Sequence, residues 1–301
     1  MTPVNYNVGI VNALAHLTMT PTEARHLSRI RAYYGRSRRG YNLLLWGAKH
    51  FGYYPLDADI SEREAQNRMH DVLASKLRLD PKIHVLDAGC GQGVVATYLA
   101  KHYGCSLQGI TVAPFEISEA RRLAEQAQVA DRVQFDLMDY SNMRFDAGTF
   151  DALFTLETLS HSPDPICTLR EFYRVLRPQG RLALFEYSLA DDDEFTPREL
   201  RMLDIVMHGS ATEGLKAFRH DSFHHIVETA GFIDVRTEDI TKHVEPSLAR
   251  LRRYARIPYI PVRLLRLQRF FPNVTAAIEF YQMAQRGLIR YNIYTGTKPT
   301  E

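Results

Sequence analysis

The amino-acid sequence predicts an α/β fold whose central sheet is mainly parallel. Between residues 83 and 188, short apolar runs alternate with amphipathic segments of helical length. The first apolar run leads into a turn with three glycines in five residues, Gly89, Gly91 and Gly93. Strands that alternate with helices form βαβ units, in which neighbouring strands are parallel. A chain of 301 residues with 45% hydrophobic and 24% charged residues can bury the core that such a sheet requires.

Helices are predicted before the sheet, in residues 1–80. The stretch that begins at Thr20 carries a helix-start signal. Ser61 precedes a second helix over 61–79, with Glu64 at the capping-box position and apolar residues on one face. We expect this part of the chain to form an N-terminal helical cap.

The sheet-forming core is predicted for residues 81–240. Short apolar runs bounded by turn residues indicate strands, and apolar periods near 3.6 indicate helices. Pro178 and Gly180 are expected to end the last helix of the series. The predicted strands cover 83–89, 106–111, 133–139, 150–158 and 181–188, and the helices cover 94–104, 114–128 and 164–180.

The last third of the chain is less regular. An acidic loop and a helix at 189–218 are expected to form a substrate insertion, before a further helix and strand. Residues 241–301 are predicted to form a basic helical lid and a last strand. There are no internal repeats and no low-complexity linker, so one integrated domain is expected.

Composition narrows the class of protein. The net charge of +2 gives no indication of a nucleic-acid-binding face. Cys90, Cys105 and Cys167 form no CxxC pair, so neither a disulfide framework nor a metal site is predicted. Neither a signal peptide nor an apolar run of about 20 residues is recognisable. We therefore expect a cytoplasmic protein.

The glycine-rich turn, placed between a strand and a helix, predicts a cradle for a polar ligand. Glycines let a ligand approach the backbone, and the helix N–H groups face it. A dinucleotide fingerprint needs glycine where Val94 stands and an acid at the end of the second strand, which reads Gly109-Ile110-Thr111. A Walker A loop needs a Gly-Lys-Ser/Thr sequence, which is absent. Both classes are disfavoured, although a nucleotide oxidoreductase and a non-catalytic binding protein remain as alternatives.

The turn and two later segments resemble a known family. "VLDAGCGQG" at 85–93 resembles motif I of class I S-adenosylmethionine (SAM)-dependent methyltransferases. "LMDYSNMRFDAGTFD" at 137–151 and "LRPQGRLALFEY" at 176–187 are similar to that family's later motifs and occur in the same order. The resemblance implies a Rossmann-like sheet with an antiparallel last strand, and SAM as the cofactor.

The resemblance also implies which residues bind SAM. The acid of the first strand, here Asp87, organises the loop that holds the methionine end of the cofactor in that family. Asp139 corresponds to the acid that accepts a hydrogen bond from the adenine amino group. The full implied set is Tyr34, Asp87, Gly89, Cys90, Gly91, Gly93, Ile110, Thr111, Val112, Asp139, Tyr140 and Leu156.

Three segments narrow the resemblance to the sterol C24-, γ-tocopherol and cyclopropane-fatty-acid methyltransferase group. "GITVAP" at 109–114 is similar to the segment that lies along the adenosine in place of a ribose-binding acid. "TLETLSHSPDP" at 155–165 is similar to the group's E-x-x-x-H segment, so Glu157 and His161 are expected to border cofactor and substrate. "KHFGYY" at 49–54 is similar to part of the segment that closes over SAM.

These enzymes share attack of an electron-rich carbon or a heteroatom on the sulfonium methyl group. Attack by an alkene leaves a carbocation, which aromatic faces and carboxylates stabilise. Residues 33–54 supply many aromatic side chains, Trp46 among them, although such density is also typical of a core. The candidates for a base or a cation stabiliser are Glu157, His161, Tyr187 and His50.

The expected function is therefore transfer of a methyl group from SAM to a carbon of a prenyl, terpenoid or sterol-like molecule in specialised metabolism. The alternatives are O- or N-methylation of a small aromatic natural product and cyclopropane formation on a lipid. The expected partner is a hydrophobic or prenylated small molecule.

The basic stretch at 250–269 allows three interpretations. It is a solvated helix face, a mouth whose arginines bind an amphiphilic or diphosphate-bearing lipid, or a site of peripheral membrane contact. The spacing does not separate them. The aromatic N-terminal helices also suit exchange between subunits of a homo-oligomer.

Overall fold

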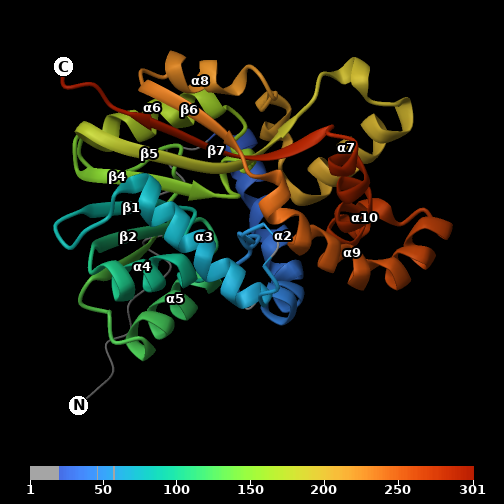
Figure 1. The fold of residues 1–301 in the computed structure, drawn as a ribbon, viewed down its shortest axis with the longest axis horizontal. Coiled ribbons are helices and arrows are strands. Elements are labelled where there is room, and N and C mark those ends of the chain that lie inside the picture. The colour runs from blue at the N-terminus through green and yellow to red at the C-terminus, as the bar shows by residue number, and fades with distance from the viewer. Residues whose placement is uncertain (1–19, 46, 57) are drawn as a thin grey trace.

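A computed structural model of the protein describes residues 20–45, 47–56 and 58–301 (Figure 1). In these residues one sheet has the strand order β3-β2-β1-β4-β5-β7-β6. Neighbours from β3 to β5 are parallel, whereas β7 is antiparallel to both β5 and β6, which confirms the predicted sheet. The strands are β1 His84–Ala88, β2 Ser106–Thr111, β3 Val133–Leu137, β4 Phe150–Leu156, β5 Leu176–Leu189, β6 Ile233–Asp239 and β7 Ile289–Thr297.

Helices cover both faces of the sheet, and side chains of β5 show why. Leu182 and Leu184 pack into the core that contains α6 and α8, and Ala183 and Phe185 pack into the core that contains α3, α4 and α5. Successive residues of a strand point to opposite faces, so a strand buried on both faces is continuously apolar. The helices are α2 Pro21–Leu45, α3 Glu62–Leu77, α4 Val94–Tyr103, α5 Pro114–Gln126, α6 Pro165–Val175, α7 Pro197–Ser210, α8 Phe223–Thr229, α9 Thr241–Leu264 and α10 Pro272–Gln285, with short 3₁₀ turns η1 Leu159–His161, η2 Asp192–Glu194, η3 Glu213–Ala217 and η4 Gln268–Phe270.

The prediction that Pro178 and Gly180 end a helix is wrong. The helix α6 ends at Val175, and β5 begins with the next residue and runs through both positions. The pairing of β4 with β5 shifts register in this region, so the Pro-x-Gly sequence forms an irregular start of the strand. A Cβ on Gly180 would lie 2.7 Å from the carbonyl oxygen of Arg177, which explains the glycine.

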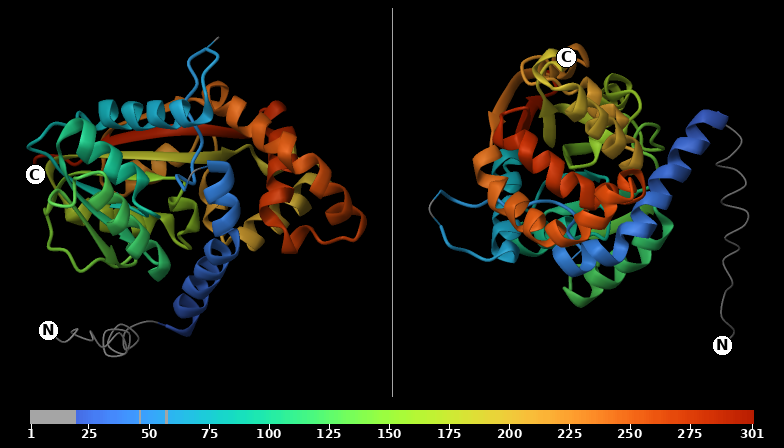
Figure 2. Two further views of the ribbon diagram at one scale, coloured as in Figure 1. Left: turned by 90° about the horizontal axis from the view of Figure 1, so that it is seen from below. Right: turned by 90° about the vertical axis from the view of Figure 1, so that its right-hand side faces the viewer.

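The helices α2, α7, α9 and α10 build a second layer beside the carboxyl ends of the parallel strands (Figure 2). The helix α10 packs against α7 and α9, and α2 contacts α7. At the other side, the Arg31 Nε–H of α2 donates to the Val112 carbonyl just after β2, at 2.7 Å. Residues 1–19 and Trp46, which belong to the predicted helical cap, lie outside the described residues.

Candidate functional site

Two adjoining cavities lie between the carboxyl edge of the sheet and the helical layer. The first has a volume of about 490 Å³ and is lined by the turn after β1 and the segments after β2, β3 and β4. The second has a volume of about 610 Å³ and is lined mainly by α2, α7, α9 and α10. Ligands of open α/β sheets bind at this edge, where the strand order reverses, here between β1 and β4. Four residues line both cavities and so form the wall between them: Tyr34, Lys49, Glu157 and His161.

The floor of the first cavity is the glycine-rich turn that follows β1. Gly89 has φ +106° and Gly91 has φ +51°, and the N–H groups of Gly89 and Cys90 donate to the Ile110 carbonyl. Asp87 is buried below the turn, and burial raises the pKa of its carboxyl group to about 8. Its Oδ2 has no hydrogen-bond partner among the described residues. A buried carboxylate oxygen without a donor marks a place for a ligand donor.

Two of the predicted cofactor residues support the cavity without lining it. A Cβ on Gly93, which has φ +75°, would lie 2.7 Å from Phe135 and 2.8 Å from Ala120. Ile110 is fully buried in the sheet. The other ten predicted cofactor residues line the first cavity: Tyr34, Asp87, Gly89, Cys90, Gly91, Thr111, Val112, Asp139, Tyr140 and Leu156.

The segment after β3 forms the far wall of the first cavity. Oδ1 of Asp139 accepts hydrogen bonds from the backbone N–H and the hydroxyl of Ser141, both at 2.8 Å, which fixes the turn. The Tyr140 hydroxyl donates to the Thr158 carbonyl at 2.7 Å, and the Thr158 hydroxyl donates to the Ala88 carbonyl at 2.9 Å. These bonds tie the ends of β1, β3 and β4 together around the cavity.

The structure adds a carboxylate that sequence reasoning missed. Glu116, in the first turn of α5, is buried and lines the first cavity. Its Oε2 accepts a 2.6 Å hydrogen bond from the Thr111 hydroxyl, and its Oε1 pairs with the Lys49 ammonium group. The sequence has no acidic residue at the end of β2, and this absence could have directed attention to Glu116. The first turn of α5 follows β2 and lies at the same edge of the sheet, so an acid there can take the same place.

Lys49 was also missed, and it lies where the two cavities meet. Its side chain is 10% exposed, and its Nζ is 4.5 Å from the ring centroid of Tyr34. A Cβ on Gly91 would lie 3.8 Å from Lys49 Nζ, so the ammonium group lies over the glycine-rich turn. The site thus combines a largely buried cation, Lys49, with two buried carboxyl groups, those of Asp87 and Glu116.

Glu157 follows β4 and lies in the wall between the cavities. It has φ +57°, a left-handed conformation that costs free energy in a non-glycine residue and is common at functional sites. Its Oε1 accepts from the Phe51 N–H and the Tyr291 hydroxyl, both at 2.9 Å, and its Oε2 accepts from the Tyr187 hydroxyl at 3.2 Å. Burial nevertheless raises the pKa of Glu157 to about 7. Such a carboxyl group can exchange a proton near neutral pH.

His161, at the end of η1, lies beside Glu157 in both walls and is held in one tautomer. Its Nδ1–H donates to the Ala211 carbonyl at 2.9 Å, so its Nε2 accepts from the Tyr34 hydroxyl at 2.8 Å. Burial lowers the pKa of His161 to about 4, so the ring is neutral at pH 7.

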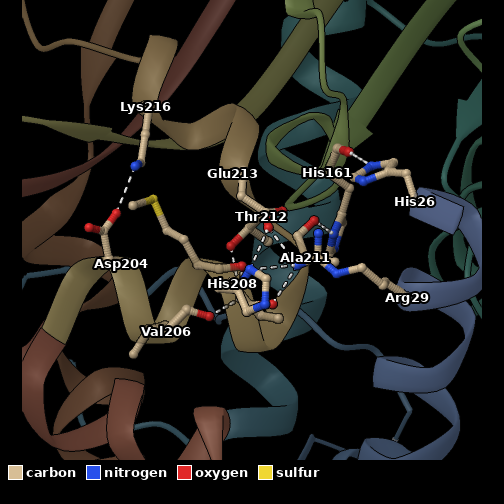
Figure 3. A network of polar contacts seen from close by, with 12 residues as sticks. His26, Arg29, His161, Asp204, Val206, His208, Ala211, Thr212, Glu213 and Lys216 are labelled. Carbon is tan, nitrogen blue, oxygen red and sulfur yellow. Dashed lines mark hydrogen bonds and ion pairs between the residues drawn. The ribbon is translucent and has the colours of Figure 1, made fainter. Parts of the chain in front are cut away.

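The contacts of His161 belong to a wider network that holds α2 against α7 (Figure 3). The His26 side chain of α2 donates to the His161 carbonyl at 2.7 Å. Arg29 donates to the His208 carbonyl at 2.6 Å and pairs with Glu213 at 2.5 Å. The network fixes the helix that carries Tyr34 over both cavities.

His50 lines the first cavity, but both of its ring nitrogens are engaged within the protein. Its Nδ1–H donates to the Phe51 carbonyl at 2.8 Å, and its Nε2 accepts from His70 at 2.9 Å. Burial lowers the pKa of His50 to about 4. This geometry favours a positioning role for His50 over proton transfer.

The second cavity is lined mainly by aromatic and aliphatic side chains. Its charged wall residues are Arg36, Lys49 and Glu157. None of the arginines between 252 and 269 belongs to its wall, so the sequence-based idea that they bind a diphosphate inside the mouth has no support in the cavity lining. The apolar wall residues include Leu44, Leu45, Phe51, Val206, Leu215, Leu248, Leu251, Phe270, Phe271, Val274 and Phe280, with the tyrosines Tyr33, Tyr34, Tyr41, Tyr187 and Tyr254.

The first cavity suits SAM in size and in chemistry. The turn places glycine backbone at the cavity floor, the unpartnered Asp87 oxygen can accept from an ammonium group, and Glu116 and Asp139 offer carboxylates along the wall. Bound SAM supplies an electrophilic methyl group on a sulfonium. The residues shared by both walls would then lie between the cofactor and a molecule in the second cavity.

Comparison with known proteins agrees with this geometry. A methyltransferase domain model matches residues 85–180. The chain is 33% identical to the S-adenosyl-L-methionine-dependent Diels-Alderase iccD of Talaromyces variabilis, over 90% of this chain and 94% of that protein. It is 31% identical to a sterol 24-C-methyltransferase of Debaryomyces hansenii over 55% of this chain and 46% of that protein. The fold is similar to the cyclopropane synthase MmaA2 from Mycobacterium tuberculosis, with a TM-score of 0.78 and 17% identity over 93% and 100% of the two chains. The chain therefore belongs to the SAM-dependent methyltransferase family, and its cofactor is SAM.

Proposed function

We propose that the protein transfers a methyl group from SAM to a carbon of a neutral, lipophilic acceptor such as an isoprenoid alkene. The observation that carries the proposal is the buried Glu157 carboxyl group in the wall that the two cavities share. Formation of the new C–C bond uses the alkene π electrons and leaves a carbocation on the adjacent carbon. Loss of a proton to Glu157 restores a neutral product, and a pKa of about 7 suits that transfer.

Aromatic side chains around Glu157 can stabilise the cation before the proton leaves. The rings of Phe51, Tyr187 and Tyr291 surround this carboxyl group, with centroids of Tyr187 and Tyr291 5.1 Å apart. Aromatic faces attract cations, and the attraction is stronger where water is excluded. Tyr34 and His161 would add a neutral polar edge that orients the acceptor without competing for the methyl group.

The second cavity supports a neutral acceptor of moderate size. A volume of about 610 Å³ lies within the usual range for small-molecule sites. Its cationic wall residues are Arg36 and Lys49, and Lys49 is already paired with Glu116. Such a wall favours an apolar isoprenoid over a diphosphate ester.

The test is incubation of the protein with methyl-labelled SAM and a panel of neutral terpenoid, sterol and phenolic acceptors, with NMR of the product. The proposal expects the label on an sp³ carbon or an exocyclic methylene derived from an alkene. It also expects Glu157→Gln to lower kcat by at least about 100-fold with little change in SAM affinity. A label on oxygen or nitrogen would overturn C-methylation.

A second candidate is a cyclisation in which SAM is bound but not consumed. The observation that favours it is the similarity to the Diels-Alderase iccD, which extends over 90% of this chain. The same incubation separates the two: a cyclisation gives a product isomeric with the substrate and no S-adenosylhomocysteine. Glu157→Gln would then retain most activity, because a concerted cycloaddition transfers no proton.

A further inference from the structure

The strongest feature outside the two cavities is the charge pattern of α9, η4 and the start of α10. Residues 246–278 contain seven arginines and no aspartate, glutamate or lysine. A segment of this length with one sign of charge carries a strong local field, although the whole chain has a net charge of only +2. The field lies at the end of the molecule remote from α4 and α5 (Figure 1).

Some of these arginines are used within the fold, and others are not. Arg250 pairs with Glu62 at 3.0 Å, and the Arg252 guanidinium lies 4.7 Å from the ring centroid of Tyr281. Across the part of the chain that the structure describes, no ion pair includes Arg253, Arg256, Arg263 or Arg266, which are all exposed.

Large apolar side chains are exposed between these arginines. Ile257 is 79% exposed and lies one helical turn after Arg253. Ile260 is 58% exposed and lies one turn after Arg256 and one turn before Arg263, and Leu264 is 76% exposed. A single exposed leucine is ordinary, but a contiguous apolar and basic patch marks an interaction surface. We call this patch the α9 surface: Arg253, Arg256, Ile257, Ile260, Arg263, Leu264, Leu265, Arg266, Phe270 and Phe271.

The α9 surface continues into the mouth of the second cavity. Phe270 and Phe271 are 61% and 47% exposed, and they also line that cavity. Tyr254 and Pro258 on α9 are likewise exposed residues of the cavity wall. The α9 surface and the second cavity are therefore continuous through these four side chains.

We propose that the α9 surface docks on an anionic phospholipid bilayer and that the acceptor enters the second cavity from the bilayer. Arginines in the interface are attracted by anionic headgroups, and apolar side chains between them insert below the headgroups. No helix in the described ranges is both long and apolar enough to cross a membrane. The entry route depends on the proposed function, whereas the docking does not.

A second copy of this chain is a poorer occupant. Two α9 surfaces face to face would bring together eight exposed arginines without a carboxylate between them, and like charges in an interface are costly. A soluble acidic protein surface would satisfy the charges but would not bury the exposed apolar side chains of Ile257 and Leu264.

The first test measures co-sedimentation of the protein with lipid vesicles, without cofactor or acceptor. Vesicles of phosphatidylcholine with about 30% phosphatidylglycerol are expected to bind the protein, and vesicles of phosphatidylcholine alone to bind it at least about tenfold more weakly. The variant with Arg256→Glu, Arg263→Glu and Arg266→Glu should lose at least about tenfold in affinity for the anionic vesicles. Because the assay uses no acceptor, its result is independent of the proposed methyl transfer.

A matched control reverses three charges at the other end of the molecule: Lys82→Glu, Lys101→Glu and Arg132→Glu, which are all exposed. Both triple variants carry the same net charge, so a general charge effect would weaken them equally. The proposal expects less than about a twofold change for the control. Ile257→Ser with Leu264→Ser should also weaken vesicle binding while leaving the thermal unfolding temperature unchanged.

Three results would overturn the proposal. They are no binding of the wild-type protein to anionic vesicles, equal losses in the two charge-reversal variants, and binding to a soluble acidic protein without binding to vesicles.

Discussion

Replacing Glu157 by glutamine should make the folded protein more stable relative to the wild type as the pH rises. Burial raises the pKa of this carboxyl group from 4.5 to about 7 in the folded state. The folded protein therefore keeps a proton that the unfolded chain releases, and unfolding is increasingly favoured as the pH rises between these values. The stability that comes from the protonated form is fully present below 4.5 and is lost through pH 7.

The magnitude follows from the two pKa values. Between about pH 5 and about pH 8, the wild type loses about 2–3 kcal/mol of unfolding free energy through this one group. Glutamine has no charge to bury, so Glu157→Gln should gain that amount relative to the wild type over the same range. Asp87 also has a raised pKa, but it titrates in both proteins and cancels in the difference. The charge of Glu157 contributes to the raised pKa of Glu186, so its removal lowers that pKa and adds to the difference in the same direction.

The assay is urea unfolding of wild type and Glu157→Gln without ligands at both pH values. The control is Glu125→Gln, which replaces an exposed carboxylate of α5. The difference in unfolding free energy between this control and the wild type should not increase with pH. A wild-type-to-variant difference that stays constant with pH, or that changes in the opposite direction, would refute the assignment of a neutral-range proton to Glu157. In that case, a lower kcat of Glu157→Gln in methyl transfer could not be explained by the loss of a proton acceptor at this position.

Three further predictions concern the first cavity. Gly93→Ala should lower the unfolding free energy by about 1–3 kcal/mol in urea unfolding, because the residue has φ +75° and the methyl group would lie 2.7 Å from Phe135. Asp87→Asn should weaken SAM binding by about 10- to 100-fold in calorimetry, because a charge-assisted hydrogen bond is lost; unchanged affinity would remove Asp87 from the binding site. Lys49→Met should cost about 3 kcal/mol by leaving the Glu116 carboxylate unpaired, and adding Glu116→Gln should recover most of it; additive losses would show that the pair does not interact.

The sheet and the floor of the first cavity could be predicted because both depend on local sequence. Strands that are buried on both faces appear in the sequence as continuous apolar runs. The turn after Asp87 needs positive φ angles at Gly89, Gly91 and Gly93, which glycine adopts more easily than other residues. Gly93 shows the limit of that reasoning, since its missing side chain makes room for Phe135 and not for a ligand.

The second cavity could not be predicted, because its wall is assembled from distant parts of the chain. Tyr33 on α2 donates to Asn273 on α10 across 240 positions, at 2.6 Å. The Lys49–Glu116 pair likewise joins residues 67 positions apart. No local period encodes such contacts. The sequence alone leaves the three interpretations of the basic stretch at 250–269 open, because it does not show that α9 lies beside a cavity mouth.

The helix α2 has a consequence for how the two ligands influence each other. One continuous helix of 25 residues supplies Ile30 to the wall of the first cavity, Tyr41 to the wall of the second and Tyr34 to both. The network that includes Arg29 and Glu213 holds the helix in place, so the ordering that both ligands share is that of the Tyr34 side chain. A ligand in one cavity that orders this side chain leaves less conformational entropy for the ligand in the other cavity to restrict. Cofactor and acceptor should therefore bind with positive cooperativity, and by linkage each should raise the affinity of the other by the same factor.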